Sequence, residues 1–356
     1  MSASNIMEAL AGVIGENDEE ATVTRFLDTG YPPLNEASTS DWDRGFPVGR
    51  LIEIAGPASS GKTAIATKVM IAAQKAGGIA CFMDHEHSFS TRLAINMGLV
   101  TDRAWVYKKP DTFEQSIAIF NKVVASIREK KLIANTAPIV WVFDSLAAMI
   151  PRSTLYDDKG ELRDPEKLNM SDHLALAKAT STHFKVLAMM AEKYDACVIV
   201  LNQLRSKIGV IYGDSNTTTG GNAPEFYYSQ RLRLSAKKIK KPKIDAPIGM
   251  EITGTFVKNK IAAPFKKATW RFMFQEDGSG HFDVERSLIE YLDEHQFIER
   301  SGAPGSVKFE GKSINKETLA RQIEAEGETG FNKLKALLPK KSEYETIGEI
   351  EVSKSK

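Results

Sequence analysis

The sequence of 356 residues predicts an α/β protein with a mostly parallel sheet, an antiparallel extension of that sheet and a small α/β C-terminal domain. Three observations predict this fold. Short apolar runs alternate with amphipathic segments up to residue 203, which is typical of parallel strands covered by helices on both faces. Segments of alternating polar and apolar residues then follow one another without helices between them. From residue 281 to residue 339 the pattern is helical again.

The parallel strands are expected in a series of apolar runs with helices between them. These runs cover residues 50–55, 79–84, 105–107, 139–144 and 197–203. A helix is predicted after the first run, because Ile65 and Val69 recur at helical spacing. A second helix begins at a capping box formed by Thr112 and Gln115, and a long third helix covers residues 171–194. The apolar face of the second helix consists of Phe113, Ile117, Phe120, Val124 and Ile127.

The antiparallel extension is expected in the strings "RLRLSA", "MEITGTFVKN" and "TWRFMFQ", which begin at residues 231, 250 and 269. Apolar and polar side chains alternate along them, as in strands with one face toward the core. Residues 279–340 are then predicted to form the small C-terminal domain, and residues 341–356 a polar tail.

Composition restricts the class of protein and its location. Lys and Arg together number 47 and Asp and Glu 46, a formal net charge of +1, so any surface for nucleic acid must be local. Cys81 and Cys197 both lie in apolar runs and are expected to be buried free thiols in a reducing compartment. Neither an apolar run of membrane-spanning length nor a signal pattern is found. The expected location is the cytoplasm, without membrane association.

The string "GPASSGKT" follows the first predicted strand and opens the first predicted helix. In such a phosphate-binding loop the backbone N–H groups surround the phosphates, the lysine reaches the β- and γ-phosphates, and the threonine hydroxyl binds Mg²⁺. The alternative, a chance glycine-rich turn, is disfavoured by this strand-to-helix setting. The nucleotide-binding residues are Gly56, Pro57, Ala58, Ser59, Ser60, Gly61, Lys62 and Thr63.

Two carboxylates are candidates for the chemistry at this loop. Asp144 ends an apolar strand, where nucleotide-hydrolysing proteins with this loop hold Mg²⁺, although many buried strands end in Asp for turn chemistry. Glu86 lies in "MDHEH" and is a candidate for the base that polarises the attacking water; ordinary polar caps are the other interpretation. A metal cluster there is disfavoured because no cysteine or second histidine pair completes it. A kinase, a helicase motor, a transporter ATPase and a recombinase all fit these residues.

A polar, glycine-containing segment distinguishes among these classes. The string "NQLRSKIGVIYGDSNTTTGGNAPEFYYS" starts at Asn202, and "VKNKIAAPFK" starts at Val257. Together with "GPASSGKT", "DHEH" and "VFDSLAAMIP", they closely resemble the RecA recombinase family. The resemblance extends over residues 27–339 in the same order, and the divergence suggests a phage-encoded member. Without these neighbouring motifs the segment would be interpreted as a surface loop rich in turn formers.

The resemblance implies a role for each matching residue at the nucleotide. Lys62 and Thr63 bind the ATP phosphates and Mg²⁺, with Asp144 as the second residue on the Mg²⁺ side. Glu86 becomes the hydrolytic base, and Gln203 senses the γ-phosphate and passes its state to the following loop. Two lysines reach the same phosphates from a neighbouring subunit, and they match Lys258 and Lys260. Such a head-to-tail contact generates a helical filament. The family further implies an oligomerisation arm in residues 1–30 and a RecA-type ATPase core in residues 31–278.

In the family the loop grips single-stranded DNA near the filament axis. The chain implied by the resemblance is a DNA-dependent ATPase that uses ATP and Mg²⁺, pairs single-stranded DNA with homologous double-stranded DNA and exchanges strands. Two alternatives stay open: a hexameric DNA helicase of the same fold, and a non-catalytic DNA-binding mediator. The positions that match the DNA contacts are Ser181, Lys185, Arg205, Ile208, Thr219, Gly220, Gly221 and Asn222.

The chain departs from the family pattern at several positions. His85 replaces an alanine before the hydrolytic glutamate, and it is expected either to change the pKa of Glu86 or to face solvent. Ser90 and Leu93 replace the residues beside the adenine, which puts base selectivity in question. Glu225 replaces a lysine at the subunit interface, so a compensating residue is expected elsewhere.

Overall fold

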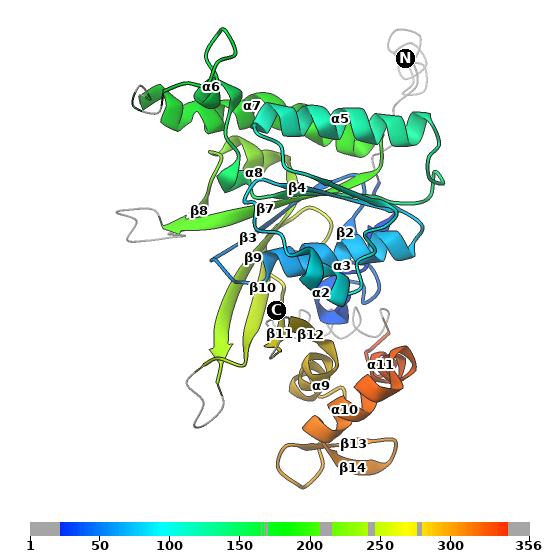
Figure 1. Cartoon of the computed structure of the whole chain (residues 1–356). Coiled ribbons are helices and arrows are strands. Elements are labelled where there is room, and N and C mark those ends of the chain that lie inside the picture. Colours follow the sequence, from blue (N-terminus) through cyan, green and yellow to red (C-terminus); the bar gives the residue numbers. More distant parts are fainter. Residues whose placement is uncertain are drawn as a thin grey trace, which may run out of the picture.

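A large mixed sheet with helices on both faces forms the centre of the chain (Figure 1). The computed structural model describes residues 22–164, 166, 168, 170–206, 216–240, 246–275 and 280–340. The strands are β1 Phe26–Leu27, β2 Phe46–Pro47, β3 Leu51–Gly56, β4 Ile79–Asp84, β5 Trp105–Lys108, β6 Ile139–Asp144, β7 Ala196–Ser206, β8 Asn216–Thr218, β9 Tyr228–Ile239, β10 Gly249–Asn259, β11 Lys267–Phe274, β12 Gly280–Asp283, β13 Ser306–Phe309 and β14 Lys312–Asn315. The helices are α2 Pro32–Thr39, α3 Lys62–Lys75, α4 Thr91–Asn96, α5 Phe113–Glu129, η1 Leu146–Ala148, α6 Arg152–Leu155, α7 Met170–Lys193, α8 Ala223–Tyr227, α9 Val284–Glu294, α10 Lys316–Glu326 and α11 Glu328–Lys335.

Within the described residues the central sheet has ten strands, in the order β12-β11-β10-β9-β3-β7-β6-β4-β5, with β8 attached to β7. The strands from β5 to β3 are parallel to their neighbours, and β9 is parallel to β3. The antiparallel part starts only where β10 pairs with β9. The predicted α/β fold, with a mostly parallel sheet and an antiparallel extension, is confirmed.

The apolar runs form parallel strands because both of their faces are buried. Along β4, Ala80 and Phe82 face the core that contains α3, whereas Cys81 and Met83 face the core that contains α5 and α7. Neighbouring strands alternate in the same way, as period-two geometry requires. None of the helices in the described part of the chain is long and apolar enough to cross a membrane.

Helix α5 begins at the predicted capping residue, with one difference. The Thr112 hydroxyl oxygen accepts a hydrogen bond from the Gln115 amide at 3.2 Å, but the Gln115 side chain accepts from the Asp111 amide at 2.7 Å rather than from Thr112. The reciprocal bond therefore forms one residue earlier than in a standard capping box. The five predicted apolar side chains of this helix are all buried.

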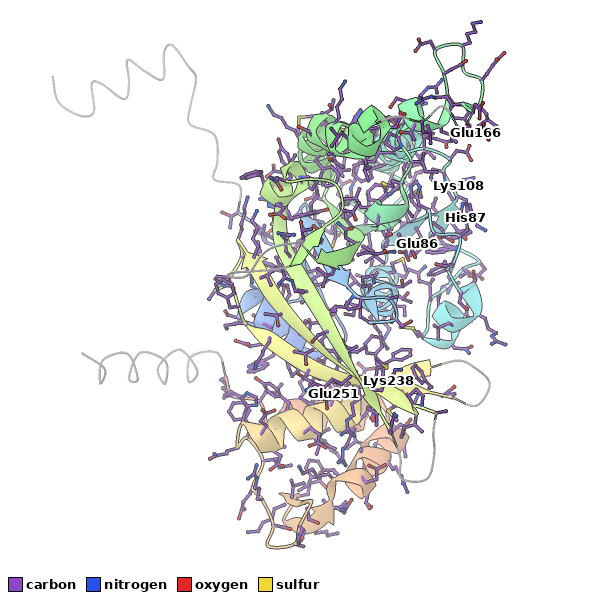
Figure 2. The ribbon with its side chains drawn as sticks, turned by 90° about the vertical axis from the view of Figure 1, so that its left-hand side faces the viewer. Glu86, His87, Lys108, Glu166, Lys238 and Glu251 are labelled. Carbon is purple, nitrogen blue, oxygen red and sulfur yellow. The ribbon has the colours of Figure 1, made fainter. Side chains whose placement is uncertain are left out.

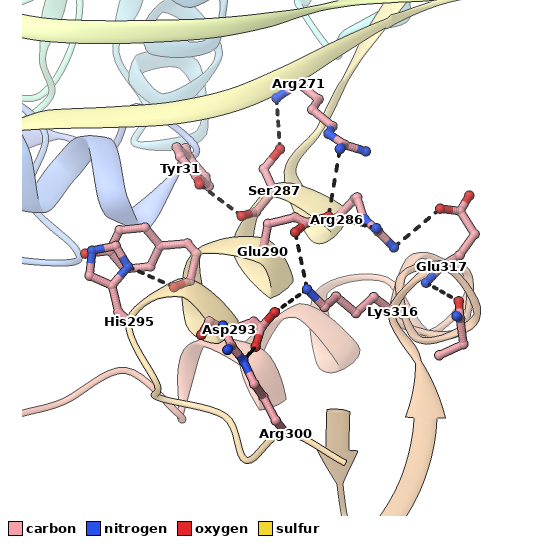
Figure 3. A network of polar contacts seen from close by, with 12 residues as sticks. Tyr31, Arg271, Arg286, Ser287, Glu290, Asp293, His295, Arg300, Lys316 and Glu317 are labelled. Atoms are coloured by element: carbon pink, nitrogen blue, oxygen red, sulfur yellow. Dashed lines mark hydrogen bonds and ion pairs between the residues drawn. The ribbon is translucent and has the colours of Figure 1, made fainter. Parts of the chain in front are cut away.

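The C-terminal helices are attached to the sheet through the N-terminal segment. The Tyr31 hydroxyl group donates to the Thr269 carbonyl oxygen on β11 at 2.9 Å and to the Ser287 carbonyl oxygen on α9 at 3.2 Å. Burial raises the pKa of Tyr31 well above its usual range, so the hydroxyl group stays a donor. Farther along the chain, Asp293 on α9 forms an ion pair with Lys316 on α10 (Figure 3).

The predicted domain division at residue 279 stays a prediction. Strand β12 still pairs with β11 of the central sheet, whereas α9, the β13–β14 hairpin, α10 and α11 lie beyond it. In Figure 1 these elements form the lower part of the molecule.

We expect Tyr31→Phe to lower the free energy of unfolding by about 1–2 kcal/mol, because two carbonyl oxygens lose their donor. Urea unfolding followed by tryptophan fluorescence measures the change. Tyr194→Phe is the matched control, since its hydroxyl group makes one exposed bond to Glu129 at 3.4 Å. The control should change stability by less than about 0.5 kcal/mol. Equal stability of Tyr31→Phe and the wild type would contradict the proposed attachment.

Candidate nucleotide-binding and DNA-binding site

The predicted phosphate-binding loop lies in the turn between β3 and α3. Gly61 caps the helix with φ of 84°, and Ser59 has φ of 57°. The positive φ of Gly61 favours glycine at this position, and a Cβ atom there would also lie 2.7 Å from Ile252 Cδ1. Of the eight predicted residues, Gly56 ends β3, residues 57–61 form the turn, and Lys62 and Thr63 begin α3. A helix N-terminus with consecutive amides in such a turn is a binding site for phosphate.

Lys62 lies over the loop that precedes it. Its ammonium group donates to the carbonyl oxygens of Gly56 at 3.0 Å and Pro57 at 2.8 Å. Burial lowers the pKa of Lys62, while the charges of Asp144 and Glu86 oppose that shift. The Ser60 hydroxyl group is buried, and the described residues give it no hydrogen-bond partner. The loop therefore offers a cation and spare polar groups, which fits a triphosphate.

Thr63 and Asp144 form the candidate Mg²⁺ site. The Thr63 hydroxyl group donates to Asp144 Oδ2 at 3.0 Å, and Asp144 is only 3% exposed. Burial, and next the charge of Glu86, raise the pKa of Asp144 to about 7. A hydroxyl and a carboxylate oxygen suit a hard cation, whose charge would stabilise the buried carboxylate. Among the described residues no cluster of three metal-binding side chains occurs, so phosphate and water oxygens would have to complete the coordination.

Glu86 lies where the ends of β4, β6 and β7 meet. Its Oε1 atom accepts from Gln203 Nε2 at 3.2 Å and also from the Ser145 hydroxyl group. The Glu86 amide donates to the Asp144 carbonyl oxygen at 3.2 Å, which holds the two acidic segments together. Figure 2 shows Glu86, His87 and Lys108 on the same side of the molecule. Glu86 and Gln203 were both predicted from the sequence to lie at the nucleotide site, whereas Ser145 was not.

Asp84 and His85, which precede Glu86 in the "DHEH" string, are held by hydrogen bonds to neighbouring elements. Asp84 accepts a hydrogen bond from the Tyr107 hydroxyl group at 2.7 Å, so it is a structural cap. His85 is 8% exposed, and its Nε2 lies 3.0 Å from the Ser116 hydroxyl group on α5. Burial lowers the pKa of His85 to about 4, so the ring is neutral. The expectation that His85 faces solvent is wrong, because α5 covers it.

Part of the predicted DNA-binding loop is held against α7. Strands β7 and β8 are antiparallel, and Gly220 and Gly221 follow β8. The Thr180 hydroxyl group donates to the Gly220 carbonyl oxygen at 2.6 Å, and a Cβ atom on Gly221 would lie 3.0 Å from Ala177 Cβ. Close packing therefore places the glycine turn beside the helix that carries the predicted contacts. Two further predicted contacts, Ser181 and Lys185, are exposed on α7, and Gly221 and Asn222 are exposed on the turn, whereas Thr219 is half-buried and Gly220 buried.

Two predicted DNA contacts, Ile208 and Arg205, lie wholly or partly outside the part of the chain that the structure describes. Ile208 lies outside the described residues, together with the rest of segment 207–215. Arg205 is described in its backbone only, where it pairs with Thr217 across the β7–β8 hairpin. The pairing of β7 with β8 starts at Leu204, directly after Gln203 (Figure 1).

Lys258 and Lys260 lie together against α8. Both ammonium groups donate to the Phe226 carbonyl oxygen, at 3.4 Å and 3.3 Å, and Lys258 also donates to the Glu225 carbonyl oxygen. Burial, followed by the charge of Lys260, lowers the pKa of Lys258. Two cations at such close range favour the approach of an anion.

Two of the departures from the family pattern have a local explanation. Glu225 forms an ion pair with Arg231 at 3.1 Å, so its charge has a partner within the chain, and the expected compensation at the subunit interface stays a prediction. Ser90 caps α4 by accepting from the Leu93 amide at 3.3 Å. The hydroxyl group of Ser90 is therefore engaged in the helix cap.

Sequence reasoning also missed a buried network behind the site. Glu53, in the middle of β3, accepts from Asn202 at 3.0 Å and from Arg231 at 2.6 Å. An acidic residue within the apolar string "LIEIA" is the signal that could have indicated it, because a buried charge requires partners.

Comparison with known proteins identifies the family. The family model described as the RecA N-terminal domain matches residues 13–279. The chain is 34% identical over 306 residues to Protein RecA of Kineococcus radiotolerans, an alignment that covers 83% of this chain and 80% of that protein. It is 38% identical over 260 residues to Protein RecA of Citrifermentans bemidjiense, covering 73% and 70%.

A third relative gives a similar result. Protein RecA of Bacteroides thetaiotaomicron is 36% identical over 294 residues, which cover 80% of this chain and 78% of that protein. The range matched by the family model includes the phosphate-binding loop and the segment that follows Gln203. The resemblance predicted from the motifs is thus confirmed, and the chain belongs to the RecA family.

Proposed function

We propose that this RecA-like recombinase is a DNA-dependent ATPase that forms a helical filament on single-stranded DNA and exchanges strands with homologous duplex. The observation that carries the proposal is the bond between Gln203 and Glu86. Gln203 belongs to β7, and β7 continues directly into the predicted DNA-binding loop. One side chain therefore connects the nucleotide site with the DNA site.

The hydrolytic step uses residues at the strand ends. Lys62 and the loop amides bind the phosphates, and Thr63 and Asp144 would hold Mg²⁺, which neutralises phosphate charge when bound. Glu86 accepts a proton from a water molecule as that water attacks the γ-phosphorus and the bond to ADP breaks. Ser145 and Gln203 orient the Glu86 carboxylate through its Oε1 atom.

ATP would strengthen DNA binding through Gln203. A γ-phosphate that attracts the Gln203 side chain changes its bond to Glu86 and, with it, the start of the β7–β8 hairpin. Loss of that phosphate reverses the change. The coupling has to be reciprocal, so DNA must favour ATP binding as much as ATP favours DNA binding.

The proposed filament depends on Lys258 and Lys260. Their ammonium groups lie beside α8 and contact backbone carbonyls of their own chain. In a head-to-tail contact they would reach ATP held by the next subunit, which repeats into a helix rather than a closed dimer.

Single-stranded DNA would be bound mainly through its backbone. The glycine turn at residues 220–221 allows close approach of amides to phosphates, and Lys185 is exposed on the adjacent helix. Backbone contacts carry no sequence preference, so homology would be read by base pairing between the two DNA molecules. The two buried free thiols are in keeping with a proposed cytoplasmic location.

The decisive experiment measures phosphate release with and without single-stranded DNA and then strand exchange in the same preparation. A recombinase should show DNA-stimulated hydrolysis, filaments in electron micrographs and joint molecules. Closed rings that unwind duplex would instead indicate a hexameric helicase. DNA binding without stimulated hydrolysis would indicate a mediator protein.

We expect Glu86→Gln to reduce ATP turnover by about 10²–10⁴-fold, because the amide cannot accept the proton from water. ATP binding should persist, and filaments on DNA should dissociate more slowly than those of the wild type. Lys62→Ala should instead lose ATP binding, measured with a fluorescent ATP analogue. Glu129→Gln, at the far end of α5, is the neutral control. Normal turnover by Glu86→Gln would show that another residue is the base.

Mixing two inactive variants tests the subunit-bridging site. If Lys258 acts on the neighbour's ATP, an equal mixture of Lys62→Ala and Lys258→Met chains contains about a quarter of sites with both intact halves. DNA-stimulated hydrolysis should therefore recover to about a quarter of the wild-type rate. No recovery, with filaments still visible, would place the action of Lys258 within its own chain.

A further inference from the structure

A carboxylate that takes no part in the proposed hydrolysis is buried behind the site. Glu53 lies in the middle of β3, three residues before Gly56, and is 1% exposed. Its Oε1 atom accepts from Asn202 Nδ2 at 3.0 Å and its Oε2 atom from Arg231 Nε at 2.6 Å. Both oxygens are thus satisfied, as a buried carboxylate requires.

Through Asn202, Glu53 reaches β7 and the residues that follow β8. Asn202 directly precedes Gln203 on β7, and its Nδ2 also donates to the Thr219 carbonyl oxygen at 2.9 Å. Thr219 lies at the far end of the loop, just after β8. One amide group therefore connects Thr219, one of the predicted DNA contacts, to the buried carboxylate.

Arg231 connects the same carboxylate to Thr218 on β8 and to Glu225 on α8. Arg231 donates to the Thr218 hydroxyl oxygen at 3.2 Å and pairs with Glu225 on α8 at 3.1 Å. The backbone carbonyl of Glu225 in turn accepts from Lys258. The guanidinium group presents several donors in one plane, so its orientation is determined by all three partners together.

We propose that Glu53 is a positioning residue that acts through Asn202 and Arg231 to place the glycine turn at residues 220–221 for DNA binding. This inference rests on the proposed function of the loop. Glu53 touches neither DNA nor nucleotide. Its carboxylate sets where Thr218 and Thr219 lie relative to Gln203, and thereby how well the glycine turn fits a DNA backbone.

The test uses Glu53→Gln in the full-length protein. The glutamine keeps a carbonyl oxygen for Asn202 but presents an amide group to Arg231, which is also a donor. We expect the concentration of single-stranded DNA for half-maximal ATP hydrolysis to rise about tenfold, as for loss of one charged hydrogen bond. The KM for ATP and kcat at saturating DNA should stay within about twofold of the wild type.

Hydrogen exchange provides a second readout that needs no DNA. In Glu53→Gln the amides of residues 217–219 should exchange faster than in the wild type, while those of the remaining β3 residues stay protected. If Glu53 only stabilised the fold, Glu53→Gln would speed exchange in both groups of amides alike. It would also change the DNA requirement and the ATP parameters together.

Two further variants complete the design. Glu192→Gln removes an ion pair with Arg50 at 3.0 Å, just before β3, from a side chain that is 53% exposed, and should change neither parameter. Thr218→Val removes one partner of Arg231 without burying a new charge, and should raise the DNA requirement by a smaller factor. Should Glu53→Gln fold poorly, Thr218→Val decides the question.

The outcomes separate this inference from the proposed function. Unchanged DNA requirement and unchanged exchange in Glu53→Gln would overturn the positioning role while the wild type still showed DNA-stimulated hydrolysis. A wild type without such stimulation would overturn the proposed function. In that case faster exchange at residues 217–219 in Glu53→Gln would still show that Glu53 positions these residues.

Discussion

The register of the parallel strands is the constraint on which the site depends. Strands β3 and β7 pair Gly56 with Gln203, and strands β4 and β6 pair Asp84 with Asp144. The carboxyl ends of all these strands therefore open at one edge of the sheet, where ligands bind in open α/β folds. A shift of one residue would turn every side chain to the opposite face and separate Glu86 from its partners. Burial of both sheet faces makes such a shift costly.

Polar side chains within the apolar layers then give this edge a defined shape. Asp84 is held by Tyr107, His85 by Ser116, and Gly220 by Thr180. The first bond joins the end of β4 to the neighbouring strand β5, and the other two join loops at the edge to buried residues of α5 and α7. Hydrogen bonds are stronger in such surroundings than in water, and an unpaired group there is costly, so each loop has one favoured position.

Structural features that depend on residues close together in the sequence could be predicted. Contacts between residues far apart in the sequence could not. The phosphate-binding loop and the apolar face of α5 follow from short strings, and the structure contains both. The bond between Ser145 and Glu86 joins residues 59 positions apart, and no local pattern indicates it. The ion pair of Glu225 with Arg231 was not predicted, because it depends on how α8 lies against β9.

The two cysteines have a practical consequence. Cys81 and Cys197 are free thiols in the two core layers, fully buried between strands and helices, and burial raises the pKa of both. The reactive thiolate form is therefore scarce, and reagents cannot reach the sulfur atoms of the folded chain. A single cysteine introduced on an exposed helix position would be the one site open to maleimide dyes. Fluorescent labelling of this protein needs no removal of its native thiols.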